Sequence, residues 1–213
     1  MGLRKNLIII SAGALGREVR DLAAGIETEQ GEKCPWRLKG FLDDRDLSPG
    51  GIPILGSPAS YEPKKSDVFI CAIGDPVQRT KYSSILRERG GQFVVMVEPS
   101  SKIGGRTDLG SGCVVGPFCV LSCDVKAGED TIITSHVTVG HDVRLGSSCH
   151  VGAHVFLGGG VVVGNQVTIH PHATLLPGVR IGDGATIGAG SVVMRSVSEW
   201  LTVFGMPAMS VSE

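Results

Sequence analysis

An apolar residue recurs at every sixth position through the second half of the chain. From Ile103 to Val193, fifteen of sixteen such positions hold Ile, Leu or Val, and Ala127 is the exception. Counting this residue as the first of a hexad, the second is glycine in eleven of the sixteen hexads. A period of six matches neither a helix nor an isolated alternating strand. It is typical of a parallel β-helix, in which each hexad forms one short strand and three hexads form a triangular coil of eighteen residues.

The first hundred residues show a different pattern, in which short apolar segments alternate with helical ones. We predict strands and helices in the order Leu7–Ile10 (strand), Arg17–Ile26 (helix), Leu38–Leu42 (strand), Val68–Ile73 (strand), Val77–Arg89 (helix) and Phe93–Val97 (strand). Pro49, Gly50 and Gly51 indicate a turn. Strands that alternate with helices predict a small parallel α/β sheet.

The distribution of charge supports a boundary between these two patterns. Residues 103–193 contain 10 charged side chains in 91, whereas the other 122 residues contain 31. The junction is expected near Glu98–Lys102, so that residues 1–98 form one domain and residues 99–213 the other.

Composition and charge exclude several classes of protein. Lys and Arg total 20 against 21 Asp and Glu, so no basic patch for nucleic acid is indicated. No run of 18 apolar residues predicts a membrane span, and no signal peptide is recognisable, so we expect a cytoplasmic protein. The six cysteines contain no C-x-x-C pair and are expected to be reduced and mostly buried.

Three loops in the N-terminal domain are candidates for ligand binding. Ligands of open α/β sheets bind at the carboxyl ends of the strands, where the chain has Gly13–Gly16, Asp43-Asp44 and Gly74-Asp75. Backbone N–H groups at the start of the first helix can hold a phosphate. Ser11 replaces the first glycine of a dinucleotide fingerprint, and the domain has fewer than 100 residues. A complete Rossmann dehydrogenase is therefore disfavoured.

The histidines also follow the eighteen-residue coil. His136, His154 and His172 share the outward-facing fourth hexad position, so they are expected to stack about 4.8 Å apart. Such a column could bind a transition metal, and the spacing of His136 and His141 is like that of the γ-class carbonic anhydrases. The third ligand of such a site is missing, because Ser100 and Gly105 occupy the matching positions. A solvated or interfacial column is favoured over a metal-dependent hydratase.

Several motifs together resemble one family over nearly the whole chain. These are a strand followed by a Gly-rich turn, Gly40-Phe-Leu-Asp-Asp44, Ala72-Ile-Gly-Asp75, Glu98-Pro-Ser100, the hexapeptide repeats with a His-acid pair, and Gly205-Met-Pro-Ala208. The chain is similar to bacterial nucleotide-sugar acetyltransferases of the left-handed β-helix superfamily, which include enzymes called sialic acid O-acetyltransferases. The resemblance implies a small Rossmann-like domain followed by a left-handed parallel β-helix.

The same resemblance assigns expected roles in substrate binding. It implies that residues 1–98 bind the nucleotide-sugar and that residues 99–213 form the acetyltransferase domain. The family's substrate-binding positions match Gly13, Ala14, Leu15, Asp43, Asp44 and Gly74.

The resemblance also assigns the chemistry. The family's catalytic base matches His141, and its acidic partner matches Asp142. The family's contacts to acetyl-CoA, the co-substrate, match His150, Pro171 and Ala189. Gly159 is a further candidate, because the missing side chains of residues 158–160 permit backbone N–H groups to approach the thioester oxygen. No metal is expected to be required. Because successive strand residues point to opposite faces, contact between His141 and Asp142 needs a corner conformation or an indirect relay.

The function expected from this resemblance is acetyl-CoA-dependent N-acetylation of a nucleotide-linked 4-amino-4,6-dideoxyhexose, for bacterial surface polysaccharide or glycan synthesis. O-acetylation of a sialic acid or another sugar is the alternative, and a metal-dependent hydratase is a weaker one. A nearly charge-free wall that includes Val161, Val162 and Val163 must be partly covered, and the resemblance implies a homotrimer with active sites between subunits.

Overall fold

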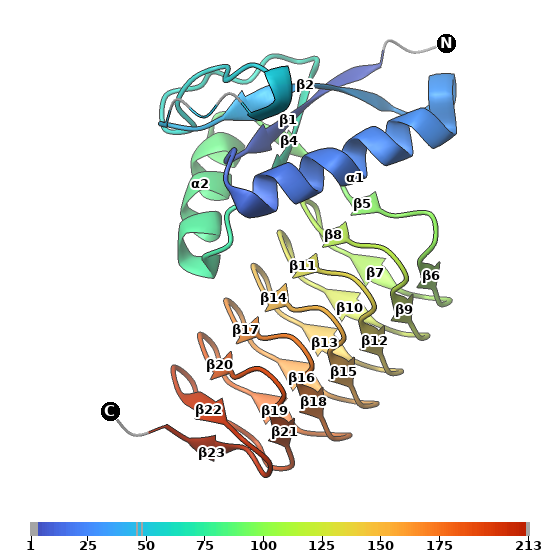
Figure 1. Cartoon of the computed structure of the whole chain (residues 1–213), viewed down its shortest axis with the longest axis vertical. Coiled ribbons are helices and arrows are strands. Elements are labelled where there is room, and N and C mark those ends of the chain that lie inside the picture. Colours follow the sequence, from blue (N-terminus) through green and yellow to red (C-terminus); the bar gives the residue numbers. More distant parts are fainter. Residues whose placement is uncertain (1–3, 46, 48, 212–213) are drawn as a thin grey trace. The chain divides into compact units, whose positions relative to one another are not determined.

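The computed structural model describes residues 4–45, 47 and 49–211, and the chain divides into two compact units, Met1–Met96 and Val97–Glu213. The first unit is built on a parallel sheet with the strand order β2-β1-β3-β4 (Figure 1). This confirms the predicted α/β class. Its elements are β1 (Lys5–Ile10), α1 (Ala14–Gln30), η1 (Gly31–Lys33), β2 (Trp36–Leu42), η2 (Pro49–Gly51), β3 (Asp67–Cys71), α2 (Pro76–Glu88) and β4 (Gln92–Phe93).

The ends of these elements differ from the sequence prediction in places. Helix α1 is longer than the predicted 17–26, because Gly13 has extended backbone and its carbonyl already accepts the N–H of Arg17 at 3.0 Å. The helix ends at Gln30, and its C-cap is Gly31, whose φ of 53° a glycine adopts without strain. Helix α2 begins at Pro76, one residue before the predicted start, because the Asp75 side chain accepts the N–H of Gln78 at 2.7 Å.

Two strand predictions were also inaccurate. Strand β3 ends at Cys71, two residues before the predicted end at Ile73. The predicted fourth strand, Phe93–Val97, is two separate strands. Its first part is β4, which pairs with β3, whereas its second part is β5 (Met96–Val97), which joins a sheet of the β-helix.

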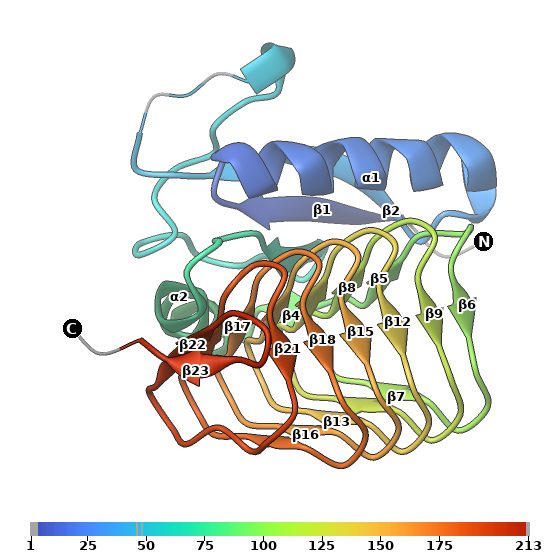
Figure 2. The ribbon, with the colours of Figure 1, turned by 60° about the horizontal axis from the view of Figure 1, so that its bottom comes forward.

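The second unit is a left-handed parallel β-helix, as the sequence predicts (Figure 2). Each of the sixteen hexads from Ile103 to Val193 contributes one strand of two residues. We call its three sheets walls 1, 2 and 3. Wall 1 includes β5, β8 (Val114–Val115), β11 (Ile132–Ile133), β14 (His150–Val151), β17 (Thr168–Ile169), β20 (Thr186–Ile187), β22 (Thr202–Phe204) and β23 (Met209–Ser210).

The other two walls continue the same pattern. Wall 2 contains β6 (Lys102–Ile103), β9 (Val120–Leu121), β12 (Thr138–Val139), β15 (Phe156–Leu157), β18 (Thr174–Leu175) and β21 (Val192–Val193). Wall 3 contains β7 (Asp108–Leu109), β10 (Lys126–Ala127), β13 (Arg144–Leu145), β16 (Val162–Val163) and β19 (Arg180–Ile181). The strands pair in register with partners eighteen residues away, so equivalent hexad positions form columns along the prism.

The interior of the prism is filled by two positions of each hexad. The first-position aliphatic residues are buried from Val115 onward, whereas Ile103 at the start of the repeats is 39% exposed. The fifth-position residues are also buried from Cys113 onward and include Cys119 and Cys149. Five of the six cysteines are buried in all, as predicted, and Cys123 is the partly exposed one. Small and β-branched side chains therefore replace aromatic rings as the packing material of this narrow core.

Two hexad positions at the corners of the prism have special backbone requirements. A Cβ on Gly104 would lie 2.5 Å from the Ser122 carbonyl carbon of the next coil, and other second-position glycines face similar collisions. The left-handed backbone, however, lies at the fourth position, where Asp124, His136 and Asp142 have φ near 60°. Asp and His tolerate this region better than most residues.

No described helix is both long and apolar enough to cross a membrane.

Adjacent glycines of the first coil provide a test of this packing. A Cβ on Gly104 meets backbone of the next coil, whereas one on Gly105 meets nothing within 4 Å. We expect Gly104→Ala to lose about 1–3 kcal/mol of unfolding free energy through overpacking. Gly105→Ala should stay within about 0.5 kcal/mol of the parent protein. Denaturant unfolding of both variants measures the difference, and equal stabilities would contradict the steric account.

Candidate active site

A histidine and an aspartate form an exposed pair at the corner between walls 2 and 3, which we call the dyad corner. His141 and Asp142 follow Gly140 after β12, and His141 Nδ1 lies 2.7 Å from Asp142 Oδ2. Both side chains are 66% exposed. Asp142 has a φ of 60°, and this corner conformation brings the two neighbouring side chains together. The contact is therefore direct, without a relay.

The next coil limits the space around the imidazole. A Cβ on Gly159 would lie 2.6 Å from His141 Nε2 and 2.8 Å from Cε1, so the ring rests against this glycine. Gly140 has the same restriction, since its Cβ would lie 2.6 Å from the backbone nitrogen of Gly159. With Nδ1 held by Asp142, Nε2 is the ring nitrogen that remains for a reacting group.

The remaining residues expected to contact acetyl-CoA lie elsewhere on the β-helix. His150 is the first residue of β14 in wall 1. Pro171 and Ala189 lie at the corner between walls 1 and 2, where the Pro171 carbonyl accepts the N–H of Gly190 at 2.9 Å. Of this predicted set, only Gly159 lies beside His141. One chain does not bring all of these positions together.

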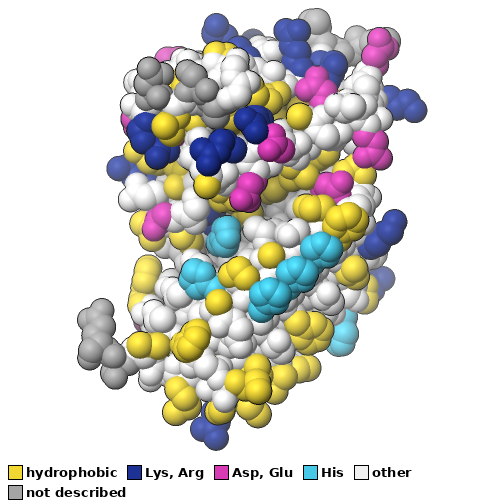
Figure 3. Space-filling view, viewed as in Figure 1, with side chains coloured by type: hydrophobic (Ala, Val, Ile, Leu, Met, Phe, Trp, Pro, Cys, Tyr) yellow, Lys and Arg dark blue, Asp and Glu magenta, His cyan; other side chains and the backbone are white. Residues whose placement is uncertain are grey.

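The predicted histidine column is present at the corner between walls 1 and 2, which we call the ladder corner. The His136 and His154 rings are 4.7 Å apart, and those of His154 and His172 are 4.8 Å apart, with nearly parallel planes. Phe118 extends the stack at 5.0 Å from His136, a contact that we did not predict. Figure 3 shows a row of histidines on the surface of the molecule. Among the described residues, no group of three or more His, Cys, Asp or Glu side chains is placed to hold a metal ion.

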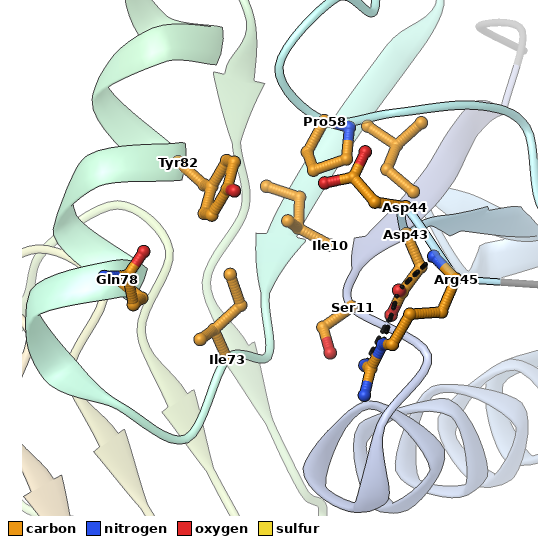
Figure 4. A pocket seen from close by; sticks show the side chains of 10 residues that line it. Ile10, Ser11, Asp43, Asp44, Arg45, Pro58, Ile73, Gln78 and Tyr82 are labelled. Carbon is orange, nitrogen blue, oxygen red and sulfur yellow. Dashed lines mark hydrogen bonds and ion pairs between the residues drawn. The ribbon is translucent and has the colours of Figure 1, made fainter. Parts of the chain in front are cut away.

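The first unit contains a pocket of about 310 Å³ at the carboxyl ends of its strands (Figure 4). Ile10 and Leu42 are the last residues of β1 and β2, and Ile73 follows β3. Tyr82 and Gln78 face the pocket from α2 (Figure 4). The complete lining is Ile10, Ser11, Leu42, Asp43, Asp44, Arg45, Pro58, Ile73, Gln78 and Tyr82.

The two acidic residues of this pocket have different environments. The Asp43 carboxylate is buried, accepts the N–H of Ala12 at 2.8 Å, and forms an ion pair with Arg45 at 2.8 Å. The hydrogen bond from Arg45 is the largest cause that lowers the Asp43 pKa to about 2. Asp44 is exposed and lines the pocket. Asp43 thus ties two loops together, whereas Asp44 faces the space that a ligand can occupy.

The other predicted substrate residues flank this pocket without lining it. Gly13 is the N-cap of α1, and Ala14 and Leu15 are its first helical residues. The Gly74 carbonyl accepts a hydrogen bond from Arg79 at 3.2 Å, which steadies the loop after β3.

Sequence reasoning missed four polar lining residues, namely Ser11, Arg45, Gln78 and Tyr82. The four-residue spacing of Gln78 and Tyr82, which places them on one helix face, was an available signal. Arg45 also lies near the start of α1, because a Cβ on Gly13 would be 3.4 Å from its guanidinium.

The Asp43 interactions predict a pH-dependent stability. Because its pKa in the folded protein is about 2, below the ordinary 3.8, ionised Asp43 stabilises the fold above pH 3.8. This contribution is lost as the pH falls through about 2. At pH 7, Asp43→Asn should lower the free energy of unfolding by about 2 kcal/mol. The difference in unfolding free energy between the parent and variant proteins should narrow below pH 4. Urea unfolding from pH 7 to pH 2 measures this, and a gap independent of pH would contradict it.

Comparison with protein families gives matches in both units. Residues 6–86 match the PglD N-terminal domain. Residues 136–171 match the hexapeptide repeat of succinyl-transferase, and residues 160–195 match the bacterial transferase hexapeptide family. No curated protein sequence matches the chain significantly.

Solved structures resemble the chain over nearly its full length. An H141N variant of perosamine N-acetyltransferase from Caulobacter crescentus, in complex with CoA and GDP-perosamine, is 27% identical, with a TM-score of 0.88 over 98% of this chain and 97% of that chain. The acetyltransferase domain of PglB from Neisseria gonorrhoeae is 25% identical, with a TM-score of 0.89 over 98% of this chain and 100% of that chain. WeeI from Acinetobacter baumannii is 25% identical, with a TM-score of 0.73 over 97% of this chain and 100% of that chain.

These matches cover the parallel sheet of the first unit as well as the repeats of the second. The chain is therefore an acyltransferase with a PglD-type N-terminal domain and hexapeptide repeats, and it resembles sugar acetyltransferases of the left-handed β-helix family over nearly its whole length.

Proposed function

We propose that the chain is an acetyl-CoA-dependent N-acetyltransferase of a nucleotide-linked amino sugar, active in the cytoplasm in the synthesis of bacterial surface glycans. The observation that carries the proposal is the His141–Asp142 pair, in which Nδ1 is held at 2.7 Å and Nε2 is left for the acceptor. Two solved relatives, described as complexes with CoA and GDP-perosamine, carry a substituted histidine, which supports a role for histidine in this family.

The chemistry follows from the orientation of the imidazole. The acceptor nitrogen attacks the thioester carbonyl carbon of acetyl-CoA and forms a new C–N bond, while His141 Nε2 takes a proton from that nitrogen. Asp142 accepts the Nδ1–H hydrogen bond and stabilises the resulting imidazolium. The C–S bond then breaks, and the sulfur leaves with the proton from His141. The products are the N-acetylated sugar and CoA.

The glycines of residues 158–160 provide a place for the thioester oxygen. The N–H of Gly158 donates to the Leu175 carbonyl at 2.9 Å, and that of Gly160 donates to the His141 carbonyl at 2.8 Å. The N–H of Gly159 remains for the oxygen that becomes negative in the tetrahedral intermediate. Because Gly159 also touches the imidazole ring, the base and the oxyanion donor are neighbours.

The pocket of the first unit suits a nucleotide-sugar. Its apolar lining, with Ile10, Ile73 and Tyr82, can pack against a base, while Asp44 can accept hydrogen bonds from the base or ribose. The Arg45 guanidinium near the start of α1 is suited to the diphosphate. The GDP-perosamine in the Caulobacter crescentus structures supports this ligand class.

The outer faces of the β-helix support a trimer with active sites between subunits. The expectation of a charge-free outer wall at residues 161–163 was wrong, because Val161 and Val163 are buried inside the prism and Val162 lies on wall 3 between Arg144 and Arg180. Wall 2 is the more apolar outer face, since it presents exposed Val120 and Phe156. Wall 2 lies between the dyad corner and the ladder corner. If wall 2 is covered by a second copy, the ladder corner of one subunit can meet the dyad corner of its neighbour. This would unite the acetyl-CoA positions that one chain keeps apart.

The dyad gives the direct test of the proposed chemistry. His141→Ala should lower kcat by about 10²–10⁴, because no other group takes the proton from the acceptor. Asp142→Asn should cost less, since Nε2 is retained. CoA release is measured with GDP-, UDP- and dTDP-linked 4-amino sugars and with the matching 4-hydroxy sugars.

Binding of acetyl-CoA by the His141→Ala protein, measured by calorimetry, controls for misfolding and should be almost unchanged. Full activity of this variant would refute the mechanism. Selective use of the hydroxyl sugars would refute N-acetylation in favour of O-acetylation.

The proposed trimer has a matched pair of test variants. Phe156 on wall 2 pairs with Thr138 and Thr174, so Phe156→Asp would place a charge in the proposed interface. Val162 on wall 3 pairs with Arg144 and Arg180, which can accommodate an aspartate. Sedimentation at micromolar concentration should give a trimer for the parent and Val162→Asp proteins and smaller species for Phe156→Asp. A monomeric parent protein would contradict the assembly.

A further inference from the structure

The dyad corner carries more charge than the catalytic pair alone. Arg106, Asp124 and Asp142 occupy the fourth hexad position of three successive coils, and their φ angles are 58°, 61° and 60°. Because the three residues share this backbone conformation and hexad position, their side chains leave the corner at equivalent places in successive coils. They form a charge column in the order positive, negative, negative, and His141 is bound to its last member.

Bonds along this column define its geometry. Arg106 Nε and one terminal nitrogen each lie 2.6 Å from an oxygen of Asp124, which makes a bidentate ion pair. The backbone connects the coils, because the N–H of Asp124 donates to the Gly105 carbonyl at 3.0 Å and that of Asp142 to the Cys123 carbonyl at 3.2 Å. The Asp124 carboxylate therefore belongs to the coil between Arg106 and the dyad.

The charges of this column influence one another across the coils. The pKa of Asp124 is lowered, mainly by the hydrogen bond from Arg106 and also by the charge of His141. The pKa of Arg106 is raised, mainly by the hydrogen bond to Asp124 and also by the charge of Asp142. The mechanism proposed above uses neither Arg106 nor Asp124.

The other groups near this corner are few. The Cys123 thiol precedes Asp124, and Gly159 borders the ring from the next coil. The charged side chains of the adjoining strands are Lys102 on β6 of wall 2 and Asp108 on β7, Lys126 on β10 and Arg144 on β13 of wall 3.

We propose that Arg106 and Asp124 are positioning residues that set the charge around the His141–Asp142 dyad. The proposal rests on the proposed role of His141 as the base. Asp124 adds negative charge that favours the imidazolium formed when the acceptor loses its proton. Arg106 offsets that charge, so that the ring is not protonated too strongly before the reaction. The balance of the pair adjusts the basicity of His141 without contact with the substrate.

The test follows the titration of His141 by NMR in protein labelled with ¹³C at histidine, with the His141→Asn protein used to assign the signal. Asp124→Asn removes a negative charge and should lower the titration midpoint of His141 by about 0.3 pH units. Arg106→Gln leaves Asp124 uncompensated and should raise the midpoint by a similar amount. The double variant should titrate near the parent protein. Arg180→Gln, a charge loss on β19, is the control and should leave the midpoint unchanged.

Salt and kinetics complete the experiment. The shifts should shrink in 1 M NaCl, where the Debye length is about 3 Å, and the acidic limb of the kcat/KM profile should move with them. Absent shifts, or shifts of the same sign in both single variants, would overturn the proposal. If the two single variants shift the His141 midpoint in opposite directions but His141→Ala retains full activity, the effect of the charge column is supported. The proposed function is then refuted instead.

Discussion

The close stacking of successive coils is the constraint on which the β-helical half of the molecule depends. Neighbouring strands are one hydrogen-bond spacing apart, and at Gly104, Gly140 and Gly146 the backbone of the next coil leaves no room for a Cβ. Because the coils cannot separate, a residue is held against its counterpart eighteen positions away. The buried aliphatic columns, the stacked imidazoles and the charges of the dyad corner all result from this one spacing.

In both units, a carboxylate orients a neighbouring functional group. Asp43 holds Arg45, two residues later, and Asp142 holds His141, the preceding residue. The two environments differ, because Asp43 is buried whereas Asp142 is two-thirds exposed. Burial makes Asp43 a structural tie between loops. Exposure leaves the His141 ring open to solvent.

The sequence was most informative where a single physical period dominates. The hexad spacing placed each strand from Ile103 to Val193 and the stacking of His136, His154 and His172. It could not locate the end of α1 or divide Phe93–Val97 into two strands, because these depend on caps and on partners far away in the chain.

The candidate sites were predictable to a smaller extent. Because Asp43 and Asp44 are identical neighbours in the sequence, the sequence could not show that Asp43 is buried against Ala12 and that Asp44 is exposed. The contact between His141 and Asp142 depended on a left-handed corner residue. The frequent Gly, Asp and His at the fourth hexad position were a usable sign of that conformation.

The eighteen-residue register also restricts how the length of such a chain can change. Adding or removing one hexad keeps the inside-outside alternation but moves every later residue to the next corner, which would separate His141 from Gly159 if it fell between them. Adding a complete coil outside this interval lengthens the prism and leaves each column aligned. Where aligned columns of side chains are needed, the chain can therefore lengthen or shorten only by whole coils of eighteen residues. Insertions at the two ends of the prism are not restricted in this way.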